Sequence, residues 1–220
     1  DFWGYQVDGI FGTQSEVDAL TYVEDGITYQ TYGPTVGPGD YKFIDQNEDG
    51  KIDEDDKVKI GSPYPDFTLG FTGDLNYKGF DLNLFIYWNH GNEIFNTVKA
   101  FTETPYEQTN MVSYMLEDAW RPDNTSATIA QLGGDRQNNY ARASDAYIEN
   151  GSFLRFKNIS LGYTLPNNIS KKIGIQKLRF YAALQNYFTI TKYSGRDPEL
   201  GSTWGVFVQK ADLGNYTIPK

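Results

Sequence analysis

Residues 66–88 read DFTLGFTGDLNYKGFDLNLFIYW, and apolar side chains occupy every second position in both halves of this stretch. A period of two predicts β-strands with one apolar face. Between the halves, Asn76-Tyr77-Lys78-Gly79 places a glycine where a tight turn needs a positive φ angle. We therefore predict a long β-hairpin over residues 66–88, with one row formed by Phe80, Leu82, Leu84, Ile86 and Trp88.

The same alternation returns twice later in the chain, over residues 153–165 and 177–190. Strands of this length exceed the roughly five to six residues that are typical of globular sheets. The chain also holds 22 Gly, 17 Tyr and 14 Phe, a composition that favours strands and turns. We predict an all-β chain, with a further strand around Asn92–Ala100 and short helices over Ser15–Leu20 and Asn110–Trp120.

Composition excludes several classes of function. A net charge of −10 argues against a nucleic-acid partner, because such binding depends on clustered Lys and Arg. No run approaches the ~20 apolar residues of a membrane-spanning helix. The chain has no cysteine and a single histidine, His90, so no Cys-His or Ser-His-Asp arrangement stands out. We do not expect an enzyme.

Two architectures fit the alternating strands. A membrane β-barrel has long strands, short turns at one end, long loops at the other and aromatic residues at both membrane interfaces. A soluble β-sandwich also alternates, and would make the chain a calcium-stabilised carbohydrate-binding module. Strand length favours the barrel, and aromatic residues near the strand ends fit its interfaces: Tyr77, Phe80, Tyr87, Trp88, Tyr163, Tyr181 and Tyr187.

Residues 45–56, DQNEDGKIDEDD, have the spacing of a calcium-binding loop. Oxygen donors at the first, third and fifth positions suit a hard cation, the glycine at position six permits a sharp turn, and position seven offers its carbonyl. An acidic residue closes the loop at position twelve. The predicted ligands are Asp45, Asn47, Asp49, the carbonyl of Lys51, and Asp56, with Asp53 acting through water.

Two features of this loop set its expected role. The twelfth residue, Asp56, is shorter than the glutamate usual at that position, which predicts modest affinity. Gly37-Pro38-Gly39 precedes the loop where a calcium-sensor motif would have a helix. We expect a structural calcium ion, and the alternative is a solvated acidic turn.

Several longer blocks resemble the SusC/RagA family of TonB-dependent transporters of Bacteroidetes, and together they span nearly the whole chain. They are Gly4–Phe11, Asp40–Asp56, Ile60–Phe67, Tyr77–Asp81, Tyr147–Tyr163, Gln185–Tyr187 and Tyr193–Glu199. The Tyr147–Tyr163 block and the Asp197-Pro198-Glu199 element are the most specific of them.

The resemblance implies the C-terminal strands of a transmembrane antiparallel β-barrel of about 22 strands in the bacterial outer membrane, with long extracellular loops and a short loop helix. It also implies a SusD-like surface lipoprotein as partner, energy from the TonB complex, and oligosaccharide or peptide nutrients as cargo. No ligand-contact motif of the family can be matched here, so the substrate-binding residues are unknown.

The resemblance further suggests how the chain is organised. Residues 1–65 are expected to form an extracellular loop region that contains the calcium-type loop, and residues 66–220 to form barrel strands with a long loop at about 101–150. A plug domain, the segment that contacts TonB and a final aromatic-ended strand are not seen in this sequence. We therefore expect a piece of a larger barrel.

Overall fold

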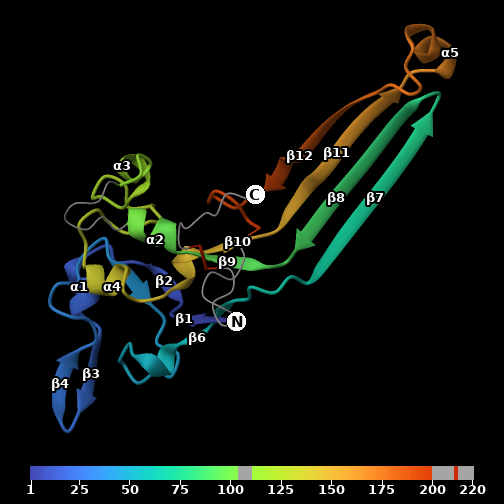
Figure 1. Ribbon diagram of the computed structural model, residues 1–220. Helices are drawn as coiled ribbons and strands as arrows, with labels where there is room; N and C mark the ends of the chain where they lie inside the picture. The colour runs from blue at the N-terminus through green and yellow to red at the C-terminus, as the bar shows by residue number, and fades with distance from the viewer. Residues whose placement is uncertain (104–110, 200–210, 213–220) are drawn as a thin grey trace. The chain divides into compact units, whose positions relative to one another are not determined.

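The computed structural model describes residues 1–103, 111–199 and 211–212 (Figure 1). The chain divides into two compact units that alternate along the sequence. We call residues 64–93 and 150–199 the sheet unit, and residues 1–63 and 94–149 with Ala211 and Asp212 the loop unit. Each unit is therefore assembled from segments far apart in the sequence.

The sheet unit is an antiparallel sheet of four long strands in the order β12-β11-β8-β7 (Figure 1). Each strand pairs along most of its length with its neighbour. A short connection with two helical turns, α5 and η3, joins β11 to β12. The bounds are β7 Phe67–Tyr77, β8 Phe80–His90, β11 Phe153–Thr164, α5 Asn167–Ser170, η3 Lys171–Ile173 and β12 Arg179–Thr191.

The predicted hairpin is confirmed, and its turn explains its register. Tyr77 pairs with Phe80, so only Lys78 and Gly79 lie between the strands. Both have positive φ angles, 47° and 89°, as a type I′ turn requires. The right-handed twist of this turn matches that of the strands, which fixes the pairing from Tyr77 back to Phe67.

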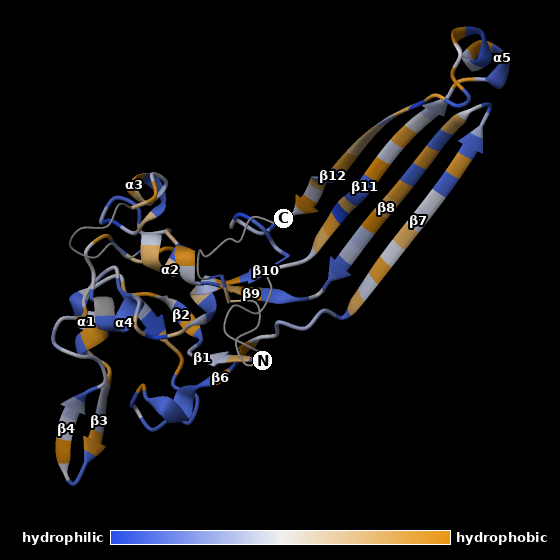
Figure 2. Ribbon diagram, viewed as in Figure 1, coloured by the Kyte–Doolittle hydropathy of each residue, from blue (hydrophilic) through white to orange (hydrophobic). Residues whose placement is uncertain are grey.

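The sheet has one apolar and one mostly polar face, visible as alternating bands along each strand (Figure 2). The register places apolar residues opposite one another across the strands: Leu69 opposite Trp88, Leu75 opposite Leu82, and Leu84 opposite Ile159. The alternate positions pair polar groups, such as Asp74 with Asn83. The predicted strands at 153–165 and 177–190 are confirmed as β11 and β12.

A β-bulge interrupts this alternation in β11. Phe156 pairs with Ile86 of β8 and Asn158 pairs with the next residue back, Phe85, so Lys157 is an extra residue. Before the bulge the apolar face carries Leu154 and Phe156, and after it Ile159 and Leu161. The extra residue therefore changes which sequence positions face the apolar side.

The loop unit is built from short strands and helical turns (Figure 1). The strands form the pairs β1-β6, β2-β5 and β3-β4 and the sheet β10-β9-β13, in which β13 runs parallel to β9. The bounds are β1 Phe2–Gly4, β2 Val7–Ile10, α1 Gln14–Asp18, β3 Thr21–Glu24, β4 Ile27–Gln30, β5 Tyr41–Phe43, η1 Glu54–Asp56, β6 Val58–Gly61, β9 Glu93–Asn96, α2 Thr97–Glu103, α3 Met115–Asp118, α4 Arg136–Asn139, η2 Asp145–Tyr147, β10 Ile148–Asn150 and β13 Ala211–Asp212.

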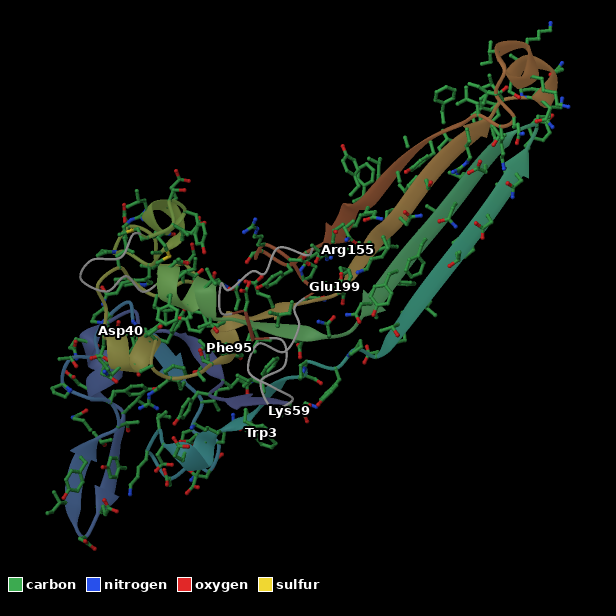
Figure 3. The ribbon with its side chains drawn as sticks, viewed as in Figure 1. Trp3, Asp40, Lys59, Phe95, Arg155 and Glu199 are labelled. Carbon is green, nitrogen blue, oxygen red and sulfur yellow. The ribbon has the colours of Figure 1, made fainter. Side chains whose placement is uncertain are left out.

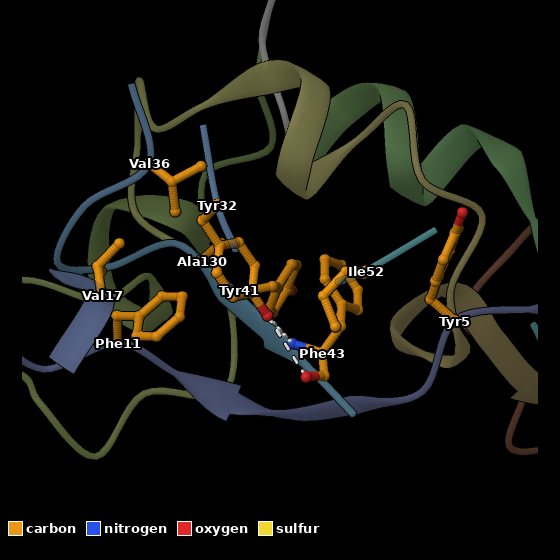
Figure 4. Packing of buried hydrophobic residues seen from close by; sticks show 9 residues of the cluster. All are labelled: Tyr5, Phe11, Val17, Tyr32, Val36, Tyr41, Phe43, Ile52 and Ala130. Atoms are coloured by element: carbon orange, nitrogen blue, oxygen red, sulfur yellow. Dashed lines mark hydrogen bonds between the residues drawn. The ribbon is translucent and has the colours of Figure 1, made fainter. Parts of the chain in front are cut away.

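An aromatic core holds the loop unit together (Figure 4). Phe11, completely buried, packs edge-on against Tyr32 with ring centroids 5.0 Å apart. The Tyr32 hydroxyl accepts a hydrogen bond from the Phe43 amide at 2.8 Å, so the ring can be buried with its polar end satisfied. Burial raises the pKa of Tyr32 to about 12. The cluster also contains Tyr5, Val17, Val36, Tyr41, Ile52 and Ala130.

A buried polar cluster ties a distant segment to this core. Asp40 is completely buried, and its carboxylate accepts hydrogen bonds from the Asp135 amide at 3.0 Å and the Asn139 side chain at 2.8 Å. Asn139 also accepts from the Tyr41 amide at 2.9 Å, and Asn138 donates to the Tyr41 carbonyl at 2.7 Å. The polar segment around residue 138 is therefore part of the packed interior.

Three sequence predictions need correction. The strand expected around Asn92–Ala100 ends at Asn96, because the Asn96 side chain accepts the Lys99 amide at 2.9 Å and caps the start of α2. The helix expected over Asn110–Trp120 is only α3, and Asn110 lies outside the described residues. Tyr87 and Tyr181 occupy the polar-face positions of the sheet, so they do not belong with the interfacial aromatic residues.

Within the described ranges, no helix is long and apolar enough to cross a membrane. The helix expected over Ser15–Leu20 is confirmed as α1, whose first turn is capped by the Thr13 hydroxyl accepting the Glu16 amide.

Candidate functional site

The acidic loop turns back on itself around Asp45. The two carboxylate oxygens of Asp45 accept the amides of Asp49 at 3.2 Å and Gly50 at 2.7 Å. The Asn47 side-chain oxygen accepts the same Asp49 amide at 3.0 Å. Gly50 has a φ of 82°, and a Cβ atom there would lie 2.7 Å from the Tyr22 side chain. The first, third and fifth predicted ligands are thus brought together by one tight turn.

Asp56 closes the loop through the backbone. It is completely buried, and its carboxylate accepts the amides of Gln46 at 2.8 Å and Asp53 at 2.8 Å. These bonds join the two ends of the loop and cap η1. Both Asp56 oxygens therefore already have amide partners, as the two Asp45 oxygens do. Asp56 is buried and Asp45 is half-buried, whereas Asn47 and Asp49 are exposed.

The donor chemistry of the loop suits a hard cation, since it consists of carboxylate, amide and carbonyl oxygens. Among residues 1–103, 111–199 and 211–212, no group of three or more Asp, Glu, His or Cys side chains is spaced to hold a metal ion. The backbone amide of Lys51 donates to Asp49 at 2.8 Å, and its side chain pairs with Glu24. Metal binding at this loop stays a prediction.

A pocket of about 360 Å³ adjoins the acidic loop. Its lining includes Asp45, Gly50 and Ile52 of the acidic loop, together with Leu20 and Tyr32. The Thr31 hydroxyl donates to the Gly50 carbonyl at 2.6 Å, which fastens the loop to the end of β4. The turn that carries the predicted ligands is therefore supported by the core of the loop unit.

The apolar face of the sheet unit carries many exposed side chains, and its residues form the apolar bands of the four strands (Figure 2). Phe71 is 61% exposed and Leu75 is 65% exposed in β7, and Ile190 is 66% exposed in β12. Soluble proteins rarely leave a continuous apolar surface of this kind uncovered. The exposed face is the property expected of strands that contact lipid.

Aromatic rings gather at both ends of this face. At one end, Phe67 packs edge-on against Trp88 at 5.0 Å between ring centroids. At the other, Phe80 packs against Tyr163 at 4.4 Å, beside Tyr77. The eleven residues of β7 span about 35 Å, which at a strand tilt of about 45° covers the ~25 Å apolar band of an outer-membrane barrel.

A charged network lies at the opposite face, where β11 begins (Figure 3). The guanidinium of Arg155, only 8% exposed, donates to Asp197 and to Glu199, each at 2.5 Å, and to the Thr189 hydroxyl at 2.8 Å. Lys157, the bulge residue, donates to the same Glu199 carboxylate. The network ties the Asp197-Pro198-Glu199 element to the sheet.

A second ionisable group is buried at the end of α2. The Glu103 carboxylate accepts the Tyr114 hydroxyl at 2.8 Å and lies 3.9 Å from the Lys99 ammonium. Burial raises the pKa of Glu103, and the Lys99 charge and the Tyr114 hydrogen bond partly offset the increase. Burial likewise raises the pKa of Tyr114.

No family model matches the chain. Its sequence is, however, similar to those of individual TonB-dependent receptors. TonB-dependent receptor P3 of Formosa agariphila is 36% identical over 199 residues, which are 90% of this chain and 18% of that protein. TonB-dependent receptor SusC of Bacteroides thetaiotaomicron is 34% identical over 177 residues, 79% of this chain and 17% of that protein.

The fold is also similar to that of a solved structure. The RagAB peptide transporter superposes with a TM-score of 0.64 at 27% identity, covering 90% of this chain and 20% of that chain. The chain belongs to the SusC/RagA family of TonB-dependent receptors. It spans about a fifth of the length of the SusC/RagA proteins that it matches. The predicted family and the predicted β-strand fold are both confirmed.

Sequence reasoning missed part of what this SusC/RagA segment contains. The Asp197-Pro198-Glu199 element was recognised, but nothing indicated that Arg155 is its partner, because the two lie more than forty positions apart. Asp40 and Asn139 looked like ordinary loop residues, and only the fold makes them a buried pair. His90, at the end of β8, stacks on Phe67 with ring centroids 5.1 Å apart.

Proposed function

We propose that this chain is part of the membrane-spanning barrel of a TonB-dependent outer-membrane transporter that imports nutrients. The observation that carries the proposal is the open apolar face of the sheet unit, bordered by aromatic rings at both strand ends. In a bilayer this face meets lipid tails, and the two inner strands, β8 and β11, are each paired with a neighbour on both sides. The polar face, with Asn83 bonded to Asp74 at 2.7 Å, meets the barrel interior.

The cargo we propose is oligosaccharide or peptide, captured with a SusD-like surface lipoprotein and moved with energy from the TonB complex. Two observations support this. One relative carries the name SusC, and the similar solved structure is titled a peptide transporter. The proposal assigns the chain no catalytic step.

We also propose that the acidic loop holds a structural calcium ion. Asp45, Asn47 and Asp49 would supply side-chain oxygens, Lys51 its carbonyl, and Asp56 the closing carboxylate. A bound ion would neutralise part of the negative charge concentrated in the turn. The role we propose for the ion is structural: it would rigidify a turn that the Thr31 hydroxyl already fastens to the core of the loop unit through the Gly50 carbonyl.

A pair of labels on adjacent strands tests the membrane proposal. Leu84 lies mid-strand on the apolar face, and Thr72 lies mid-strand on the polar face of the neighbouring strand. Each is replaced by cysteine in the full-length protein, coupled to a polarity-sensitive fluorophore and reconstituted in vesicles. We expect brominated lipid tails to quench the Leu84 probe and aqueous acrylamide to quench the Thr72 probe.

The alternative is a soluble carbohydrate-binding β-sandwich, and it predicts a different result. A second sheet would cover the apolar face, so neither quencher would reach Leu84 and the protein would stay in solution without detergent. That outcome would contradict the barrel proposal. A measurement of calcium-dependent sugar binding would then be the next step.

A further inference from the structure

The connection between β11 and β12 forms a small folded cap at one end of the sheet (Figure 1). Leu165 donates its amide to the Leu178 carbonyl at 2.9 Å, which closes the base of the cap. Gly174, with a φ of 74°, ends η3 in a left-handed conformation, and the Ile175 amide returns to the Ser170 carbonyl at 3.1 Å. Ser170 is completely buried inside the cap. These contacts hold the exposed side chains of the cap in a defined arrangement.

The charge of the cap is opposite to that of the chain. Residues 165–178 contain Lys171, Lys172 and Lys177 and no acidic residue, whereas the whole chain has a net charge of −10. Among the described residues, none of these three lysines takes part in an ion pair. The adjacent turn adds Lys78, whose ammonium lies 5.1 Å above the Tyr77 ring. These four lysines thus share one end of the sheet with Arg179, whose charge is paired with Asp81.

The cap also exposes large apolar side chains next to these lysines. Ile169, Ile173 and Ile175 are 48%, 58% and 38% exposed. Ile169 and Ile173 are four residues apart on consecutive helical turns and therefore lie on one side of the cap. Exposed isoleucine beside unpaired lysine is the composition of segments that lie in a membrane interface, with apolar groups in the acyl boundary and ammonium groups at phosphates.

We propose that the cap formed by residues 165–178 anchors this end of the barrel to the membrane interface, with Lys171, Lys172 and Lys177 binding phosphate groups of anionic phospholipids. This inference rests on the proposed function. It is supported by charge complementarity and by continuity with the apolar face, because Phe80 and Tyr163 end that face directly beside the cap.

The turn lengths indicate which leaflet is involved. The Lys78–Gly79 turn and the cap lie at the same end of the sheet, since the Thr164 amide donates to the Gly79 carbonyl at 2.7 Å. Short turns of outer-membrane barrels face the periplasm. The lipids bound by the cap are therefore phospholipids of the periplasmic leaflet.

Lipid binding by the full-length protein tests the proposal directly. Native mass spectrometry would count phosphatidylglycerol and phosphatidylcholine molecules retained by the wild type and by the triple variant Lys171→Gln, Lys172→Gln and Lys177→Gln. A lysine near an anionic surface changes binding by about fivefold, so we expect the preference for phosphatidylglycerol to fall by at least that factor. The matched control replaces Lys42, Lys57 and Lys59 of the loop unit by Gln and should leave the preference unchanged.

Three results would overturn the proposal. The triple variant could keep the full preference for phosphatidylglycerol, or the control could lose it equally. Inorganic phosphate could displace phosphatidylglycerol at similar concentration, which would identify a site for free anions rather than for lipid.

A second measurement leaves the lysines intact and so does not depend on the folding of the triple variant. A fluorophore on Ile173→Cys should be quenched by brominated lipid, whereas one on Thr28→Cys, exposed in the loop unit, should be quenched by acrylamide only. The Leu84→Cys probe separates the two proposals. Quenching at residue 84 but not at 173 contradicts only the anchor, and absence of quenching at 84 contradicts the membrane proposal itself.

Discussion

The guanidinium of Arg155 donates a hydrogen bond to the carboxylate of Glu199, which follows it by 44 positions, and it binds Asp197 through its other terminal nitrogen (Figure 3). The arginine is nearly inaccessible to solvent, whereas both carboxylates are more than one third exposed. One planar side chain therefore holds the segment after β12 against the beginning of β11.

Replacement of Arg155 by Gln should release this segment. Hydrogen bonds to charged groups contribute about 1.5–3 kcal/mol, so we expect a loss of about 2 kcal/mol in the free energy of unfolding and faster proteolysis near residues 193–199. Arg155→Lys should give an intermediate loss, because an ammonium cannot reproduce the two-pronged contact. Arg179→Gln removes a solvent-exposed pair with Asp81 in the same sheet, and because water screens that pair we expect a clearly smaller loss than for Arg155→Gln. Equal losses at both positions would contradict the assignment.

Substitution of Gly79 tests whether the hairpin turn requires its positive φ angle. A Cβ atom there would lie 2.7 Å from the Thr164 carbonyl oxygen, and the φ of 89° is unfavourable for any residue with a side chain. Gly79→Ala should therefore lower the free energy of unfolding of the full-length protein by about 2 kcal/mol, measured by denaturant unfolding in detergent. In the control Gly73→Ala, the nearest atom is 3.4 Å away, and we expect a change within about 0.5 kcal/mol. A neutral Gly79→Ala would show that the turn can adopt another conformation.

The calcium proposal is testable by titration calorimetry on the full-length protein and by thermal unfolding with and without a chelator. We expect calcium to bind and to raise the unfolding temperature, and Asp45→Ala or Asp49→Ala to reduce affinity by at least about tenfold. Glu48→Gln is the matched control, since Glu48 lies in the same turn with an exposed side chain outside the predicted ligand set. Absence of heat with the wild type, or equal effects of all three substitutions, would leave a solvated acidic turn as the better description.

The stability of the segment around Glu103 should depend on pH. Its pKa in the folded protein is raised above the ordinary value of 4.5, mainly by burial. The stability contribution of the protonated group is therefore fully present below pH 4.5 and is lost as the pH rises through the raised pKa. Hydrogen exchange of the α2 amides, followed as a function of pH, should show this loss in the wild type and not in Glu103→Gln. The exposed Glu117→Gln should behave like the wild type, and an unchanged profile in Glu103→Gln would contradict the prediction.

The sheet unit could be predicted from the sequence because its information is local. Eleven to thirteen residues of alternation specify the strands and their faces, and the Lys78-Gly79 turn specifies the register of β7 with β8, without reference to distant residues. The same reasoning placed the turn of the acidic loop. It could not establish whether a cation binds there, because that depends on the distances between oxygens and not on their order in the chain.

The loop unit could not be predicted in the same way. Its strands have only two to four residues, too few for a period to be visible. Apart from the local pair β3-β4, their partners are remote: Phe2 of β1, for example, pairs with Gly61 of β6. Asn138 and Asn139 are polar and so suggested a surface loop, yet they are buried because Asp40 and Tyr41 supply partners about a hundred positions earlier. Burial of this kind is decided by tertiary pairing.

The bulge at Lys157 has a consequence for how these strands tolerate changes in length. In a strand of period two, odd-numbered and even-numbered residues face opposite sides of the sheet. One added residue therefore exchanges the apolar-face and polar-face positions of every residue beyond it. In β11 the single extra residue is matched by a sequence whose apolar positions change from even to odd at that point. In β12 the apolar residues stay on even positions through Leu184 and Phe188, because the irregularity there spans an even number of positions. Related chains should therefore gain or lose residues in these strands in pairs, or singly only where the apolar pattern changes parity at the same residue.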